Sequence, residues 1–142
     1  MDIRRATDAD WPDFVRMASL LALDAIAPHD AHRTQFAAAV GDDRSAALVA
    51  TDDGRVVGYV LGGCLPMPLY GGQLAMLQEL YVDESHRRAG VARALVEGFT
   101  AWADERGAAI VGLATSRHAA RAFTESQGFV TRPTTYYWRR IQ

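Results

Sequence analysis

Residues 77–92 read LQELYVDESHRRAGVA, an apolar strand that passes through a short polar turn into a helix. The turn has the spacing Arg87-x-x-Gly90-x-Ala92, and the first amides of the helix that it opens have no intrahelical partner. Because the helix dipole also favours negative charge there, phosphate is the expected guest. The small residues let the backbone approach a pyrophosphate closely, while Arg87 and Arg88 place guanidinium donors at its rim. The stretch is therefore predicted to form an anion-binding site.

The six-residue spacing is too short to identify a nucleotide-binding fold by itself. It lacks the three glycines of a dinucleotide-binding fingerprint and the Gly-Lys-Ser/Thr of a nucleoside-triphosphate loop. The sequence therefore does not support either of those phosphate-binding folds. The type of phosphate site has to be identified from the strands and helices around the turn.

The hydrophobic pattern predicts strands and helices along one domain that spans residues 1–142. Strand-like patterns cover 3–6, 46–50, 56–61, 74–82, 108–114 and 134–141, and helix-like patterns cover 11–21, 31–40, 91–103 and 119–127. Residues 52–54, Asp-Asp-Gly, predict a hairpin, residues 66–72 a loop, and Gly128 a left-handed helix cap. The strand, helix, strand order of 74–114 implies a right-handed crossover and a parallel pair. Residues 108–114 are continuously apolar, as expected of a strand covered on both faces.

The composition of the chain excludes several classes of protein. The 142 residues are 49% hydrophobic and 23% charged, and no apolar run approaches the ~18 residues of a membrane span. The start of the chain lacks the order of a signal peptide, so the cytoplasm is the expected compartment. A net charge of −2 argues against a nucleic-acid-binding protein, and a single cysteine, Cys64, excludes an intrachain disulfide. His29-x-x-His32 has helical spacing for two metal ligands, but no acidic or cysteine partner follows at a suitable distance, so no metal site is expected.

The order of elements, the triplet LYV at 80–82, the turn at 87–92 and the stretch AFTESQGF at 122–129 together resemble the GNAT superfamily of acyl-CoA-dependent N-acyltransferases. The likeness covers almost the whole chain. It implies a single-domain α/β (α+β) fold with a mixed, mostly antiparallel sheet flanked by helices. It also implies that the parallel strand pair splays apart and leaves a V-shaped slot for the pantetheine arm of acetyl-CoA.

The resemblance assigns the acyl donor, acetyl-CoA, to the turn and to the strand before it. The backbone of Leu80 and Val82 would pair with the pantetheine amides, and the amides of residues 87–92 would hold the pyrophosphate. A free N–H at a strand bulge near Leu80 or Tyr81 would donate to the thioester carbonyl. Arg117, where the family often has Asn, could also reach the cofactor. The cofactor-binding residues expected from the resemblance are Leu80, Tyr81, Val82, Arg87, Arg88, Ala89, Gly90, Val91, Ala92 and Arg117.

The chemistry also needs a base, because an acceptor amine is protonated at neutral pH. Glu79 is the candidate, since it precedes Leu80 at the slot, where related enzymes often have an acidic group; the alternative is a solvent-facing carboxylate without a role. Thr124 stands where many family members have a Tyr that protonates the departing thiolate. Either Tyr136 or Tyr137 takes over from the last strand, or one packs in the core, the other stays at the surface, and the thiolate leaves without a positioned acid.

These features favour an enzyme that transfers an acetyl group from acetyl-CoA to a primary amine of a small molecule, or to a peptide N-terminus, by direct attack and without a metal. Thr124 motivates an alternative, a catalytically weak acyl-CoA-binding regulatory module. An α/β interaction domain without a cofactor is a third interpretation. Homodimers are common in the family, although no surface stripe in this sequence marks an interface.

Overall fold

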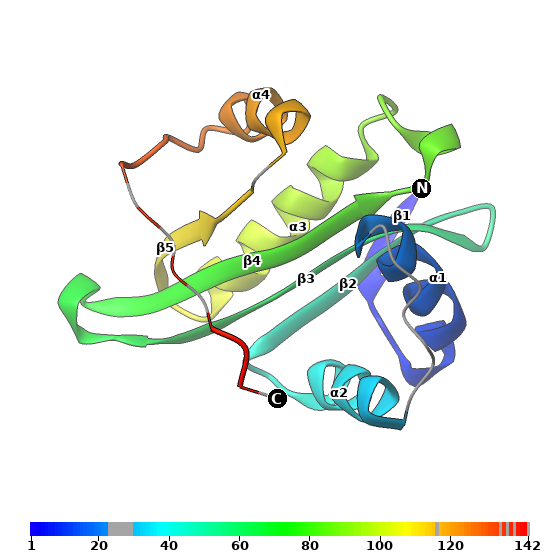
Figure 1. Cartoon of the computed structure of the whole chain (residues 1–142), viewed down its shortest axis with the longest axis horizontal. Helices are drawn as coiled ribbons and strands as arrows, with labels where there is room; N and C mark the ends of the chain where they lie inside the picture. Colours follow the sequence, from blue (N-terminus) through cyan, green and yellow to red (C-terminus); the bar gives the residue numbers. More distant parts are fainter. Residues whose placement is uncertain (23–29, 116, 134, 136, 138, 142) are drawn as a thin grey trace.

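In the computed structural model, the described residues are 1–22, 30–115, 117–133, 135, 137 and 139–141. They form a five-stranded sheet whose strands follow one another in space in chain order. Strands β1 to β4 are antiparallel, and β5 lies parallel to β4 on its other side (Figure 1). The strands are β1 (Asp2–Arg5), β2 (Ser45–Asp52), β3 (Arg55–Met67), β4 (Gly72–Val82) and β5 (Ala108–Leu113).

Helices cover both faces of the sheet, α3 on one face and α1 with α2 on the other (Figure 1). They are α1 (Trp11–Ala22), α2 (Asp30–Gly41), α3 (Val91–Glu105) and α4 (His118–Ser126), and the short 3-10 turns are η1 (Asp8–Asp10), η2 (Pro68–Tyr70) and η3 (Glu84–His86). The path from β4 through α3 to β5 is the parallel crossover unit that the sequence predicts. None of the helices formed by the described residues is long and apolar enough to cross a membrane.

Local sequence signals explain where the first elements begin and end. Thr7 and Asp10 form a capping box before α1, and the Thr7 amide donates to the Asp10 carboxylate at 2.8 Å. Asp10 is buried there and accepts two hydrogen bonds of 2.8 Å from Arg4, which hold the pKa of Asp10 below its usual range. Asp53 and Gly54 have φ values of +46° and +74°, as a two-residue hairpin turn between β2 and β3 requires.

Two hydrophobic clusters hold the helices to the sheet. The larger one joins α3 to β2, β3 and β4, and it includes the fully buried Phe99 and Leu95. The smaller one joins α1 and α2 to the opposite face through Met17, Phe36 and Tyr59. Because both faces are covered, the middle residues of β2 and β3 form continuous buried runs rather than alternating with exposed ones.

Strand β4 changes its neighbours halfway along. Against β3, the register skips Gln78, which is an extra residue between Leu77 and Glu79 and forms a β-bulge. Against β5, the pairing ends at Leu77. Residues 78–82 therefore have β3 on one side and no strand on the other among the described residues, and β4 and β5 diverge in Figure 1. The predicted α/β fold class with a splayed parallel pair is confirmed.

The loop predicted at 66–72 is wrong in extent, because β3 and β4 extend into it until only η2 separates them. Proline usually interrupts a sheet, since it has no N–H to donate. Cys64, however, directs its amide away from β4, to the Arg44 carbonyl at 2.9 Å. Pro66 faces the same way two residues later, beyond the end of β2, so no ladder hydrogen bond is lost there.

Two further predictions near the end of the chain differ from the structure. Strand β5 is only partly buried, not covered on both faces, because it is the edge strand of the sheet that the described residues form. The strand predicted at 134–141 is not formed by its described residues 135, 137 and 139–141, and the rest of that range lies outside the described residues. Helix α4 and its left-handed cap at Gly128, with a φ of +85°, agree with the prediction.

Candidate active site

The part of β4 that is free of β5 has an edge that pairs with no other strand of the described residues. Directly after β4, Asp83 donates its amide to the Val57 carbonyl at 2.9 Å. In an antiparallel pair the hydrogen-bonded positions alternate, so Tyr81 directs its backbone groups to β3, whereas Leu80 and Val82 direct theirs to the open edge. An extended chain can pair with such an edge as an added strand.

A strand bulge is predicted near Leu80 or Tyr81. In the structure the bulge lies two residues before Leu80. The register puts the extra residue at Gln78. Leu80 is the first residue after the bulge whose N–H faces the open edge, whereas the N–H of Tyr81 is directed to β3. Of the two candidates for an amide donor, Leu80 is therefore the one whose N–H faces the open edge.

The turn between β4 and α3 exposes its backbone amides. Gly90 precedes α3 with a φ of +83°, and Arg88 also has a left-handed φ of +62°, which costs an arginine about 1–2 kcal/mol. When φ alternates in sign from residue to residue, as it does from Arg88 to Gly90, successive N–H groups point towards one concave side, which suits an anion. The first hydrogen bond of the helix runs from Ala94 to Gly90 at 3.0 Å, and no described residue accepts a hydrogen bond from the amides of 88–93. Of the turn residues, Val91 is buried, Ala92 is half-buried, and Arg87, Arg88, Ala89 and Gly90 are exposed.

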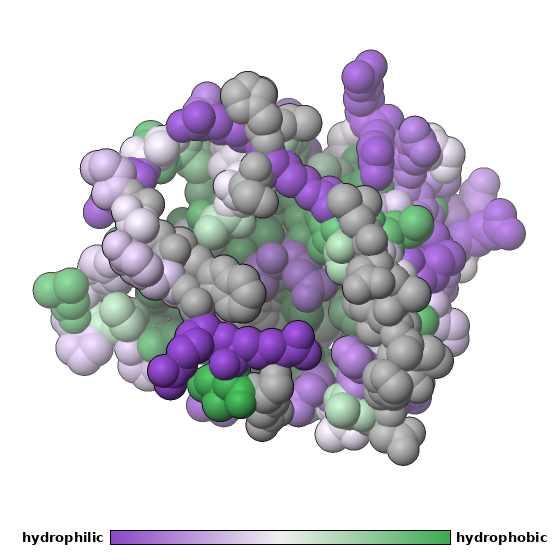
Figure 2. Space-filling model, in the orientation of Figure 1, coloured by the Kyte–Doolittle hydropathy of each residue, from purple (hydrophilic) through white to green (hydrophobic). Residues whose placement is uncertain are grey.

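Arg87 turns back onto the end of the strand. Its Nε donates to the Val82 carbonyl at 3.1 Å, and its guanidinium carbon lies 5.7 Å from the centre of the Tyr81 ring, a cation–π distance. The Val82 carbonyl, one of the acceptors on the open edge, is therefore already bonded. Arg88 is exposed, and Figure 2 shows hydrophilic surface over this end of the molecule.

Glu79 lies on β4 one residue after the bulge, on the face that α1 and α2 cover. Its Oε2 accepts a hydrogen bond of 2.7 Å from the hydroxyl of Tyr59 on β3. Burial raises the pKa of the Tyr59 phenol, and the negative charge of Glu79 raises it further, so the hydroxyl stays protonated and donates. Glu79 is half-buried in this arrangement, which differs from the alternative of a solvent-facing carboxylate without a role.

Tyr59 is the residue of this site that the sequence did not single out. Its direct partner in the register is Tyr81, so it reaches Glu79 diagonally across the two strands. The only signal in the sequence is that both residues lie on predicted strands, in which side chains alternate between the two faces. That signal places each residue on a face of its own strand but does not align the two strands with one another.

Two arginines link α1 to other segments, one to the residue directly after β4 and the other to the start of α4. Arg16 makes a two-pronged ion pair with Asp83, with N–O distances of 2.8 Å and 3.1 Å, which raises the pKa of Arg16. Arg117, which precedes α4, donates to the Leu21 carbonyl near the end of α1. The predicted cofactor residue Arg117 is therefore engaged with α1 in this structure.

Thr124, which stands in place of the family's Tyr, and Tyr137, one of the two tyrosines that could replace it, are both described. Thr124 donates its hydroxyl to the Ala120 carbonyl at 2.8 Å, within α4. Tyr137 is 87% exposed. Tyr136 lies outside the described residues.

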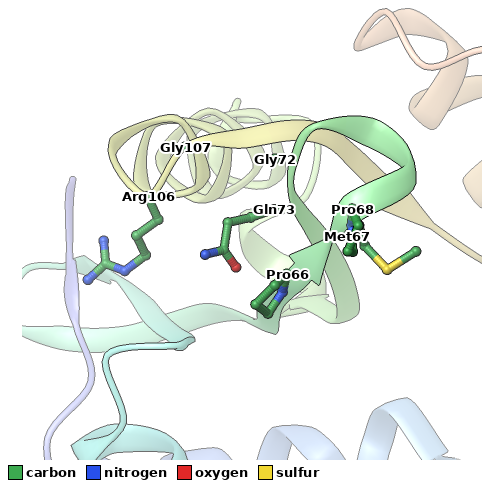
Figure 3. Close-up of a pocket in the computed structure, with 7 residues that line it drawn as sticks. All are labelled: Pro66, Met67, Pro68, Gly72, Gln73, Arg106 and Gly107. Carbon is green, nitrogen blue, oxygen red and sulfur yellow. The ribbon is translucent and has the colours of Figure 1, made fainter.

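Two surface hollows lie away from Glu79. One, of about 410 Å³, lies at the hairpin end of β3 and β4, where Figure 3 shows Gln73 and Pro66 side by side, and it is lined by Pro66, Met67, Pro68, Gly72, Gln73, Arg106 and Gly107. Gln73 precedes Glu79 by six residues of extended strand, about 20 Å. The other, of about 650 Å³, lies between α3 and the end of α4, and it is lined by Arg93, Val96, Glu97, Thr100, Ala101, Asp104, Ser126 and Gln127.

Solved structures share this fold over nearly the whole chain. A putative acetyltransferase from Agrobacterium tumefaciens is 26% identical with a TM-score of 0.88, and the match covers 99% of this chain and 100% of that one. A ribosomal-protein-alanine N-acetyltransferase from Brucella melitensis biovar Abortus is 26% identical with a TM-score of 0.80, again over 99% and 100%. An aminoglycoside acetyltransferase from an uncultured soil metagenomic sample, in complex with sisomicin, is 18% identical with a TM-score of 0.85 over 99% and 96%, a likeness of fold alone.

The comparison of sequences gives the family. No curated protein matches the chain. A sequence model of the acetyltransferase (GNAT) family, whose members use acetyl-CoA as a cosubstrate, matches residues 3–129. Because this match spans most of the chain and the open edge of β4 lies within it, the chain belongs to the acetyltransferase (GNAT) family.

Proposed function

We propose that the chain transfers an acetyl group from acetyl-CoA to a primary amine of a small molecule, or to a peptide N-terminus, by direct attack of the amine. One observation carries the proposal. The bulge at Gln78 leaves Leu80 with a free backbone edge directly beside Glu79, and the same strand leads into the turn at 87–92. A binding edge, a base and an anion site are therefore supplied by one continuous segment.

The residues present fit the acyl donor. The pantetheine arm of acetyl-CoA contains two amide groups and can pair with the open edge at Leu80 as an added strand would. The pyrophosphate suits the unbonded amides of 88–93 and the exposed Arg88. Arg117 would contribute only after it leaves the Leu21 carbonyl.

Glu79 is the proposed base, and the Leu80 amide is the proposed donor to the thioester oxygen. When the amine attacks, negative charge develops on that oxygen, and loss of one fixed N–H donor of this kind costs about 10²–10³-fold in rate. Glu79 takes a proton from the amine, because only the free amine has a lone pair with which to attack. A thiol with a pKa of ~8.5 is a tolerable leaving group near neutrality, so a positioned acid is not required.

The experiment that tests the proposal combines CoA binding with thiol release. Calorimetry on the purified chain measures the affinity for CoA, and a thiol reagent follows acetyl-CoA turnover with a panel of amines. The panel includes a peptide with an N-terminal alanine, because the Brucella neighbour is named as a ribosomal-protein-alanine N-acetyltransferase, together with an aminoglycoside and a diamine. The expected result is CoA binding and thiol release that depends on one of the amines.

The same experiment separates the alternative functions. CoA binding without thiol release for any amine would favour a catalytically weak regulatory module, which Thr124 motivates because it stands where many family members have a Tyr. No CoA binding would contradict both readings and favour an interaction domain without a cofactor.

A further inference from the structure

The hydrogen bond between Tyr59 and Glu79 joins the proposed base to the rigid aromatic core under α1. Tyr59 Oη donates to Glu79 Oε2 at 2.7 Å across β3 and β4. Only 2% of Tyr59 is exposed, and its ring centre lies 5.0 Å from that of Phe14, which lies 4.8 Å from that of Phe36. A ring packed in this way cannot change rotamer unless its neighbours move, so the phenolic oxygen is held at a fixed point.

The geometry points to Tyr59 as a positioning residue for Glu79, an inference that rests on the proposed acetyltransferase function. A glutamate side chain has three rotatable bonds, so an untethered carboxylate on a strand samples several positions. When Oε2 is tied to Tyr59, Oε1 is the oxygen left to face an amine. Tyr59 itself does not touch the reacting atoms and acts through Glu79.

The chemistry of the transfer is consistent with a donor that keeps its proton. Because burial and the charge of Glu79 raise the pKa of Tyr59, its hydroxyl stays protonated at the pH at which an amine is acetylated. The substrate ammonium loses one proton to Glu79 Oε1, which passes it to solvent. The C–N bond then forms and the C–S bond breaks, and a second proton from the nitrogen ends on the departing thiolate.

A double-mutant cycle on the full chain tests the inference. Tyr59→Phe keeps the ring and removes only the hydroxyl, Glu79→Asp keeps the carboxylate but shortens the side chain by one methylene, and a double variant combines them. Values of kcat and KM are measured with acetyl-CoA and the best amine of the panel. Tyr70→Phe is the matched control, because Tyr70 is 40% exposed in η2, at the far end of β4 from Glu79. Melting temperatures show whether each variant is folded.

Tyr59→Phe is expected to lower kcat about 10-fold, as for the loss of one hydrogen bond to a charged group, with KM for acetyl-CoA unchanged. The control Tyr70→Phe is expected to keep the wild-type rate. Glu79→Asp should lose at least as much as Tyr59→Phe, because the shorter carboxylate no longer reaches the hydroxyl. The double variant should then lose less than about 2-fold more, since the contact is already broken.

A wild-type rate in Tyr59→Phe, or losses that multiply in the double variant, would overturn the inference and leave the proposed function intact. No amine-dependent thiol release from the wild-type chain would overturn both, and that result is seen before any variant is made. If Tyr59→Phe proves unfolded, Glu79→Asp decides alone, because a wild-type kcat in that variant contradicts a positioned carboxylate.

Discussion

The two halves of β4 share a neighbour on one side and differ on the other. Residues 73–77 pair with both β3 and β5, and Ala75 and Leu77 are buried there. Residues 79–82 pair with β3, and none of the described residues pairs with their other edge. Both halves are largely apolar in sequence, so composition does not separate them. The two halves meet at one extra residue, Gln78, which directly follows the last residue paired with β5 and at which the register against β3 shifts.

This difference shows how one strand can serve structure and chemistry at once. The paired half has strand partners on both sides, so it offers little backbone to a ligand. The open half keeps free backbone groups on one edge, while β3 supports it on the other and the Arg16–Asp83 pair fixes its end. Substitutions in the open half should therefore change activity, whereas substitutions packed against the paired half should change stability.

The largest expected effect lies in the open half, at Glu79. Glu79→Gln should lower the rate at neutral pH about 10²- to 10⁴-fold, because an amide cannot take the proton of the amine. Affinity for CoA, measured by calorimetry, should be nearly unchanged. The rate should recover partly at high pH, where free amine forms without help. Glu84→Gln, an exposed carboxylate in η3, is the control, and a fully active Glu79→Gln would assign the base role to another group.

For the paired half of β4, the sharpest test of packing is Gly62 on β3. Gly62 lies opposite Leu77, the last residue before the bulge. A Cβ there would lie 2.3 Å from the Met76 carbonyl oxygen and 2.6 Å from the ring of Phe99. Gly62→Ala should therefore lower the free energy of unfolding by about 1–3 kcal/mol or more, measured by denaturant melts. Gly41→Ala, where a Cβ meets nothing within 4 Å, is the control. Equal stability of the two variants would mean that the sheet and α3 are not closely packed at this point.

A smaller effect is expected at the turn that follows the open half. Gly90→Asp should weaken CoA binding at least about 10-fold in calorimetry, because a carboxylate is brought against the pyrophosphate and the left-handed φ is lost or strained. Gly107→Asp is the matched control, since Gly107 also has a positive φ, of +73°, and open space around it, but lies at the other end of α3. Unchanged affinity in Gly90→Asp would remove the turn from the cofactor site.

Signals that act over a few residues could be predicted from the sequence. The hairpin at Asp53 and Gly54 and the left-handed cap at Gly128 each depend on the conformational preferences of their own residues. The conformation of the turn at 87–92 belongs to the same class, because it needs only a strand end, a Gly and a helix start. The splayed pair came from the family resemblance, which carried a long-range feature that local patterns do not contain.

Features that depend on the alignment of two strands could not be predicted from local patterns, and the family resemblance implied a bulge near Leu80 or Tyr81 but not its position at Gln78. The bulge at Gln78 becomes visible only when β3 and β4 are in register, and Tyr59 meets Glu79 only because that register brings them diagonally together. The sequence predicts that Pro66 lies in a loop. A proline is tolerated in β3 there because β2 begins only at Ser45, opposite Gly63, and that is a property of a strand distant in the sequence. Local preference places a residue on a face, and pairing decides what it meets.

The smallest effects are expected at Thr124, which replaces the family's Tyr, and at Tyr136 and Tyr137, the two tyrosines that could take over its role. Thr124→Ala should cost little, because the Thr124 hydroxyl is bonded to Ala120 within α4, and Tyr137→Phe should be close to wild type, because Tyr137 is 87% exposed. Tyr136→Phe completes the set. A positioned acid would show as a loss of about 10- to 100-fold in kcat in one of these variants alone, with acceptor KM kept. We expect no such loss with acetyl-CoA, since a thiolate with a conjugate acid of pKa ~8.5 departs near neutrality unaided. A selective loss in Tyr136→Phe or Tyr137→Phe would instead show that this tyrosine protonates the leaving thiolate at the open half of β4.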